Sequence, residues 1–125
     1  MAVTVADVST PLGTKLVIDS TTDTNSNAAE DNVVSGATTV YYVEIDNKNN
    51  GSATYVKLQD ATDSTPNSSV PEHVFYAASS AKTTYVIETG IAFGAGLSFW
   101  GTTTQASAST QTDPTNAVTT KILCA

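Results

Sequence analysis

Apolar and polar residues alternate with a period of two along most of this chain, and no stretch keeps apolar residues at helical spacing for more than two turns. This pattern is typical of strands that bury one face. The clearest strand covers 38–46, where Tyr41, Val43 and Ile45 share the face that we expect to point into the core. Other strands are predicted at 2–8, 14–19, 52–59, 72–77, 82–88, 97–102 and 118–123.

An Asn-Gly turn separates two of these segments. Asn50 and Gly51 accept the positive φ angles that tight hairpin turns require, so we expect 38–46 and 52–59 to pair as an antiparallel hairpin. Register is well specified where one face is buried, because a slip of one residue would expose the whole apolar set. The predicted core consists of Tyr41, Val43, Ile45, Val56, Leu58, Val86 and Leu97.

Three segments combine turn-forming residues with few apolar ones and are expected to be loops: 20–31, 60–71 and 103–116. About eight strands without helices predict an all-β fold, a single antiparallel β-sandwich of which the jelly roll is one form. The 125 residues are enough for one domain, 1–125. Its N-terminal segment, 1–13, either supplies the first strand of the sandwich or serves as an assembly arm.

The composition excludes several classes of function. Hydroxyl side chains are abundant, with 22 Thr and 13 Ser, whereas arginine is absent and the formal net charge is −7. Such a chain would repel a phosphate backbone, so nucleic-acid binding is not expected. No apolar run is long enough to span a membrane, and the N-terminus lacks the pattern of a secretory signal. A single cysteine rules out an intrachain disulfide.

Residues suited to catalysis are few. The only histidine, His73, has no Gly-x-Ser-x-Gly motif to work with, and Cys124 lies next to the last residue, where fraying is common. Two groups of carboxylates offer the oxygen ligands that calcium prefers: Asp19, Asp23 and Asp31, and Asp60 with Asp63. Neither has the spacing of a calcium-binding loop. We therefore expect neither an enzyme nor a cofactor or metal.

The densest apolar run covers 91–100 and contains Phe93, Phe99 and Trp100. A strand sends alternate side chains to opposite faces, so some of these aromatic residues could lie in the core and others at a subunit interface. Both interpretations are kept for these three residues.

Three blocks follow one another in the later part of the chain. They are a strand at 38–47, the segment Ser-Ala-Thr-Tyr-Val-Lys-Leu-Gln-Asp at 52–60 after an Asn/Gly turn, and Gly-Ile-Ala-Phe-Gly-Ala-Gly-Leu at 90–97 before a Thr/Ala-rich loop and a last strand. In this order they resemble a group of small virion proteins of tailed bacteriophages, over residues 36–124. The resemblance implies a virion β-sandwich module that is often a homotrimer.

A structural function is therefore expected. The resemblance implies a capsid decoration, or cement, protein that binds the outer face of a phage head and bridges capsomers. Its partners would be the major capsid protein and further copies of itself. It would be made in the host bacterial cytoplasm and located on the capsid exterior. Two alternatives stay open: a tail, neck or fibre-base module, and a carbohydrate-binding module in which Trp100, Tyr42 or Tyr55 stacks on sugar rings.

The N-terminal segment is the candidate capsid contact. It carries no charge before Asp7, so as an edge strand it could pair with a strand of a partner chain. The loop at 103–116 is expected to face solvent or a neighbouring subunit. The candidate contact residues are Ala2, Val3, Thr4, Val5 and Asp7.

Overall fold

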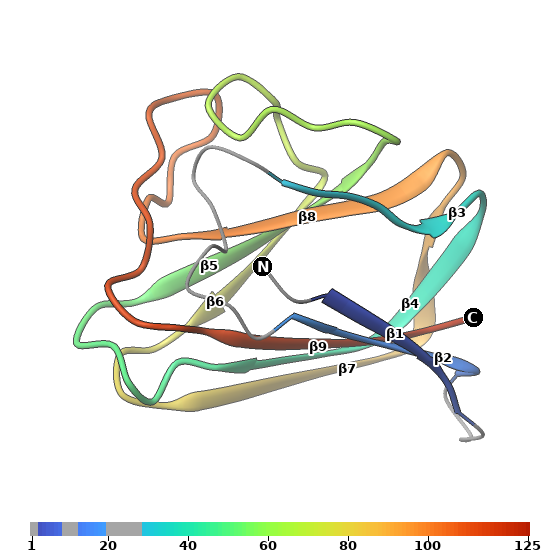
Figure 1. The fold of residues 1–125 in the computed structure, drawn as a ribbon, viewed down its shortest axis with the longest axis horizontal. Coiled ribbons are helices and arrows are strands. Elements are labelled where there is room, and N and C mark those ends of the chain that lie inside the picture. The colour runs from blue at the N-terminus through green and yellow to red at the C-terminus, as the bar shows by residue number, and fades with distance from the viewer. Residues whose placement is uncertain (1–2, 9–12, 20–28) are drawn as a thin grey trace.

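Two stacked sheets make up the described part of the chain, residues 3–8, 13–19 and 29–125 of the computed structural model (Figure 1). These residues contain no helix, so the predicted all-β fold is confirmed. The strands are β1 (Val3–Asp7), β2 (Lys15–Asp19), β3 (Glu30–Ser35), β4 (Thr38–Asp46), β5 (Thr54–Asp60), β6 (His73–Ala77), β7 (Lys82–Phe93), β8 (Gly96–Thr102) and β9 (Thr119–Cys124).

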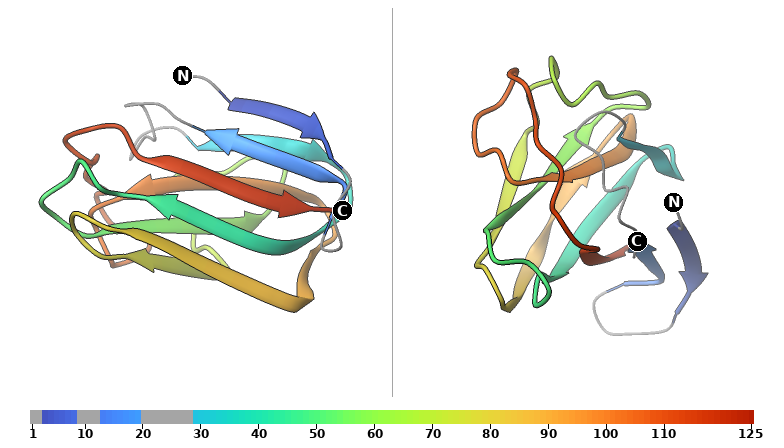
Figure 2. Two further views of the ribbon diagram at one scale, coloured as in Figure 1. Left: turned by 90° about the horizontal axis from the view of Figure 1, so that it is seen from below. Right: turned by 60° about the vertical axis from the view of Figure 1, so that its left-hand side comes forward.

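The strand order is that of a jelly roll with one additional strand. One sheet has the order β1-β2-β9-β4-β7 and the other β3-β8-β5-β6, and all neighbours are antiparallel. Figure 2 shows the two sheets face to face. Without β1, the two sheets have the four-by-four strand order of a jelly roll, in which the chain crosses repeatedly between sheets. The predicted antiparallel sandwich is confirmed in this form.

The predicted hairpin between 38–46 and 52–59 is wrong, because β4 and β5 lie in different sheets. The turn between them is an arch that crosses the sandwich, and the buried Asn47 holds it. The Asn47 Nδ2 donates to the carbonyl oxygens of Ser52 at 2.9 Å and Ala78 at 3.1 Å, and its Oδ1 accepts from Thr54 Oγ1 at 2.9 Å. The turn-forming residues after β4 therefore lie in a connection that crosses from one sheet to the other, not in a hairpin.

Most of the predicted core is confirmed. Val43, Ile45, Val56, Leu58 and Leu97 are fully buried between the sheets. These residues lie in stretches where strand alternation is regular, so the period of two identifies the inner face correctly. Burying their side chains stabilises the fold by about 1.5–3 kcal/mol each, before the entropy of ordering is counted.

Tyr41 and Val86 were assigned to the core incorrectly. A β-bulge explains the error at Tyr41, whereas Val86 faces outward through regular alternation in β7, where Tyr85 and Ile87 are the residues packed against the core. Val40 pairs with Cys124 and Tyr42 pairs with Leu123, so Tyr41 is an extra residue in β4. The bulge shifts the alternation, and Val40 rather than Tyr41 is fully buried. Val86 lies opposite Tyr42 on the outer face and is 56% exposed.

Gly90 provides the space for this bulge, and its replacement is expected to be costly. Its φ is +75°, and a Cβ there would lie 2.3 Å from Thr39 Cγ2 and 2.8 Å from Tyr41 Cε1. We expect Gly90→Ala to lower the free energy of unfolding by about 2–3 kcal/mol in urea titrations. Gly51→Ala is the control, because Gly51 has no positive φ and its Cβ would enter open space. Equal effects of the two substitutions would contradict this account of Gly90.

One strand was missed, and the loops were placed largely correctly. β3 begins with Glu30, Asp31 and Asn32, a polar run typical of a loop, and its pairing with β8 is interrupted between Glu30 and Val34. The predicted loop at 20–31 therefore ends in a strand, and residues 20–28 lie outside the described residues. Residues 61–72 and 103–118 contain no strand.

Candidate functional site

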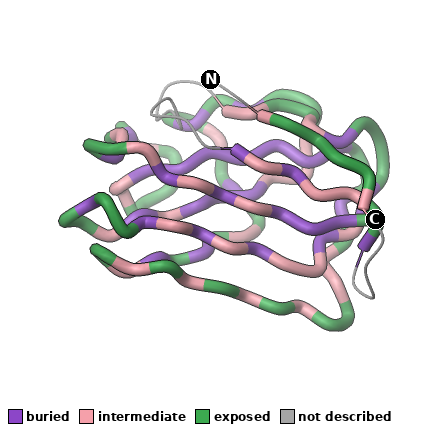
Figure 3. The backbone as a smooth tube through the Cα atoms, turned by 60° about the horizontal axis from the view of Figure 1, so that its bottom comes forward, coloured by how far each residue is buried: buried purple, intermediate pink, exposed green. Residues whose placement is uncertain are grey.

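The N-terminal strand β1 forms one end of the five-stranded sheet. It pairs with β2 along its whole length, from Val3 opposite Asp19 to Asp7 opposite Lys15, so this segment is the first strand of its own sheet. Four of its five residues are exposed, including Val5 at 45%. In Figure 3 this strand is mostly in the colour of exposed residues. Among the described residues, no strand pairs with its second edge. Ala2 lies outside the described residues.

The other sheet ends are less suited to accept a partner strand. The pairing of β3 is irregular and Asn32 has a φ of 48°. β7 is bulged opposite Tyr42. At β6, the Tyr85 hydroxyl donates to the carbonyl oxygen of Tyr76. Bulges and covered edges are the usual means by which sheets avoid edge pairing. Within the described ranges, β1 is therefore the regular sheet end whose second edge pairs with no strand.

Phe93, Phe99 and Trp100 are all buried within the single chain. Phe93 and Phe99 belong to the core between the sheets, whereas Trp100 is buried on the outer side of the four-stranded sheet. Phe93 packs edge-on against His73, with ring centroids 6.0 Å apart. Phe99 lies opposite Leu58 and points between the sheets. These side chains leave no exposed surface for a neighbouring subunit to contact.

Trp100 and Lys57 lie opposite each other on the outer side of the four-stranded sheet, yet both are fully buried. The loop at 103–116, at the upper left of Figure 1, follows β8 and contacts Lys57. The Lys57 ammonium donates to Ala106 O at 2.7 Å and to Gln111 Oε1 at 2.8 Å, and burial lowers the pKa of Lys57. The loop predicted to face solvent or a neighbour therefore packs on its own sheet.

Asp60 closes the turn between β7 and β8. Its carboxylate accepts hydrogen bonds from the backbone N–H groups of Gly94 at 3.0 Å, Ala95 at 2.8 Å and Gly96 at 3.4 Å. The Gly94 and Ala95 amides hold the pKa of Asp60 below its usual value. The glycine-rich turn is thus a small anion site that the chain's own carboxylate fills, and Asp60 has few lone pairs left for calcium.

The remaining calcium candidates do not form a metal site in the described residues. No group of three or more His, Cys, Asp or Glu side chains there is arranged to hold a metal ion. Asp31 accepts a hydrogen bond from Ser64 N at 2.8 Å. Asp23 lies outside the described residues.

Glu30 is an acid whose titration should affect stability. Burial, followed by the nearby carboxylates of Asp19 and Asp31, raises the pKa of Glu30 to about 7. Because folding raises this pKa, the folded state favours the protonated form of Glu30. The resulting stabilisation is fully present below the unfolded pKa of 4.5 and is lost as the pH rises through the folded pKa of about 7. Glu30 is partly exposed and solvent screens the effect, so we expect a loss of about 1–2 kcal/mol between pH 5 and pH 8.

Urea titrations of wild type and Glu30→Gln at these two pH values measure this loss. The variant cannot ionise, so it should lack this part of the pH dependence. Glu88→Gln is the control, because Glu88 is an exposed carboxylate on β7. An identical pH dependence in wild type and Glu30→Gln would show that Glu30 does not titrate in this range.

His73 and Cys124 do not form a catalytic arrangement. Cys124 does not fray: it pairs with Lys15 on one side and Val40 on the other and is fully buried. Burial raises the pKa of its thiol, which lowers its reactivity at neutral pH. His73 is partly buried beside Phe93.

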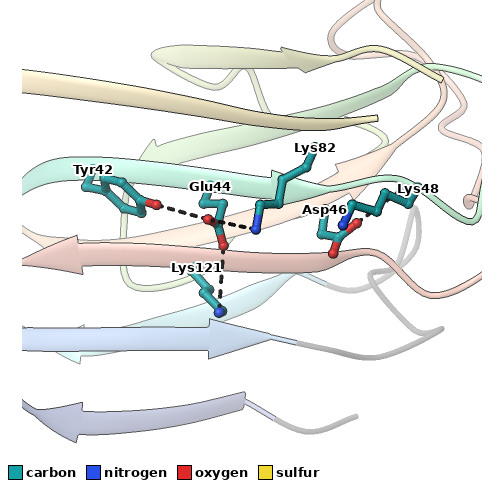
Figure 4. Close-up of polar contacts among 6 residues, drawn as sticks. All are labelled: Tyr42, Glu44, Asp46, Lys48, Lys82 and Lys121. Carbon is teal, nitrogen blue, oxygen red and sulfur yellow. Dashed lines mark hydrogen bonds and ion pairs between the residues drawn. The ribbon is translucent and has the colours of Figure 1, made fainter. Parts of the chain in front are cut away.

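The aromatic residues considered for sugar binding do not form one platform. Trp100 is buried, and Tyr42 lies on the outer face of the five-stranded sheet, where its hydroxyl donates to Glu44 Oε1 at 3.0 Å (Figure 4). Tyr55 lies on the other sheet, with its ring centroid 5.6 Å from that of Tyr76, which is 49% exposed. Tyr55 is half-buried, so within this pair Tyr76 supplies the exposed aromatic surface.

Comparison with models of protein families, with curated proteins and with solved structures found no match. Among the described residues there is also no helix that could cross a membrane.

Proposed function

We propose that this protein is a structural component of a phage virion, a decoration protein that binds the outer face of the capsid and bridges capsomers. The observation that carries the proposal is the regular, exposed strand β1 with its unpaired second edge. The jelly-roll order of β2 to β9 adds support, because this architecture is common in viral capsid domains, although fold alone does not define function.

Strand addition is the proposed mode of capsid binding. A strand of the major capsid protein would form main-chain hydrogen bonds with the free edge of β1, and alternate side chains would provide specificity. The only charged residue of β1, Asp7, lies 3.2 Å from Lys15 Nζ, so its charge is partly compensated. The protein would act as a homotrimer on the capsid exterior after synthesis in the host cytoplasm.

Deletion of residues 2–9 tests this mode. Among the β1 side chains only Val3 packs against the core, so the truncated protein should stay folded by circular dichroism but bind undecorated heads at least about a hundredfold more weakly. Normal binding by the folded deletion variant would overturn the proposed contact. If the deletion unfolds the domain, the single variants Thr4→Pro and Val5→Pro are used in its place. Successive N–H groups of a strand point to opposite edges, so one of these two prolines removes a hydrogen-bond donor from the free edge of β1.

Two alternatives can be separated from the capsid role. The number of copies per purified virion distinguishes a decoration protein, present in hundreds of copies, from a tail, neck or fibre-base module present in far fewer. Carbohydrate binding has one supporting observation, the Tyr55–Tyr76 pair with its exposed Tyr76 ring on a fold also found in lectins. Saturable binding on a glycan array that Tyr76→Ala abolishes would favour that function.

A further inference from the structure

The outer face of the five-stranded sheet carries an apolar row that crosses all five strands. Backbone register places one residue of each strand side by side, and we call these five residues the outer row: Ala6, Leu16, Leu123, Tyr42 and Val86. They point away from the core residues Val17 and Val43 of the same sheet. Ala6 and Val86, at the two ends of the row, are exposed, Leu16 and Tyr42 are half-buried, and Leu123 at the centre is 8% exposed. Val86, at one end of the row, is among the most exposed large apolar residues in the described chain.

The two sheets differ in what covers their outer faces. The four-stranded sheet has a third layer, because the loops at 61–72 and 103–116 pack on it through contacts such as Lys57 with Gln111 and Ser98 Oγ with Ala61 O. No described segment lies in front of the five-stranded sheet in the left view of Figure 2. An apolar row on a sheet face without such a layer indicates an interaction surface.

Charge indicates which partner fits this face. The outward positions beside the outer row carry two lysines and three carboxylates: Lys82, Lys121, Glu44, Asp46 and Glu88. Glu44 forms ion pairs with both lysines (Figure 4), at 3.5 Å to Lys82 Nζ and 3.7 Å to Lys121 Nζ. These five charges sum to −1, whereas the whole chain carries −7. Two copies can therefore meet through this face with less like-charge repulsion than the rest of the molecule would impose.

We propose that the outer row is a self-association surface, against which a second copy of this chain packs. Apolar side chains from the two copies exclude water at the centre, and the paired lysines and carboxylates form a polar rim. Two copies that meet through the same face are related by a twofold axis, so this contact forms a dimer, and it does not depend on a role in the virion.

Sedimentation velocity over a range of concentrations tests the proposal with the full-length chain. Wild type should associate, and Val86→Lys should raise the dissociation constant at least about tenfold, because the ammonium would be buried without a partner. Val74→Lys is the matched control, since Val74 is 46% exposed but lies on the other sheet. A monomeric wild type at up to about 1 mM, or weakening of association in Val74→Lys as great as in Val86→Lys, would overturn the proposal.

Lysine acetylation of the wild-type protein gives a second readout that needs no variant. The side chains of Lys82, Lys121 and Lys15 are 45%, 43% and 44% exposed in the single chain, so they should react at similar rates in dilute solution. At concentrations where the chain associates, Lys82 and Lys121 should become protected relative to Lys15. Equal protection of all three, or protection of Lys15 alone, would place the interface elsewhere and overturn the proposal.

Discussion

Replacing Lys57 by alanine is expected to lower the free energy of unfolding by about 3–5 kcal/mol, a large effect for a lysine. The substitution removes a fully buried side-chain stem and leaves Ala106 O and Gln111 Oε1 without the donor they share. The loop at 103–116 would lose its main polar tie to the sheet. Urea unfolding measures the loss, and faster proteolysis near Ala106 would report loosening of the loop.

Two further variants separate the sources of this effect. Lys57→Met keeps most of the buried stem but not the ammonium, so its cost should fall to about 1–3 kcal/mol. This cost comes mainly from Gln111 Oε1, because Ala106 O still accepts from Gln111 Nε2 at 3.0 Å. Lys48→Ala removes an exposed lysine and should change stability by less than about 0.5 kcal/mol. If Lys57→Met is as stable as wild type, the hydrogen bonds of the ammonium make no net contribution, and packing alone explains Lys57→Ala.

Regular strands could be predicted from the sequence because local alternation determines which face is buried. Val56 and Leu58 are examples, since β5 pairs without a register shift. Tyr41 could not be predicted in this way, because the bulge depends on the fit of β4 between β7 and β9. At Val86 the local pattern is ambiguous, because apolar residues lie on both faces of β7, and only the pairing with β4 places Tyr85 rather than Val86 on the inner face. The partner of a strand is also a non-local property. The turn after β4 has hairpin residues, but the jelly-roll order sends the chain to the opposite sheet.

For the candidate sites too, features set by the local sequence could be predicted and features set by distant contacts could not. The exposure of β1 follows from its terminal position and its small and polar residues, so a local pattern was enough to select it. Burial of Lys57 depends on Gln111, 54 residues later, and the Asp60 site depends on amides 34 to 36 residues away. No local signal identifies such partners. Trp100 was open to the sugar-binding hypothesis for this reason, since the sequence does not show that a loop covers it.

Phe99→Ala is expected to lower the free energy of unfolding by about 3–5 kcal/mol, through lost transfer energy and the cavity left between the sheets. Val74→Ala, at an exposed site on β6, is the control and should cost less than about 0.5 kcal/mol. Urea titrations at two protein concentrations that differ about a hundredfold also show whether Phe99 lies in the core or at a subunit interface. Substitution of a core residue lowers the free energy of unfolding equally at both concentrations, whereas the effect of substituting an interface residue depends on concentration. Because Phe99 is fully buried in the single chain, we expect its difference from wild type to be the same at both concentrations.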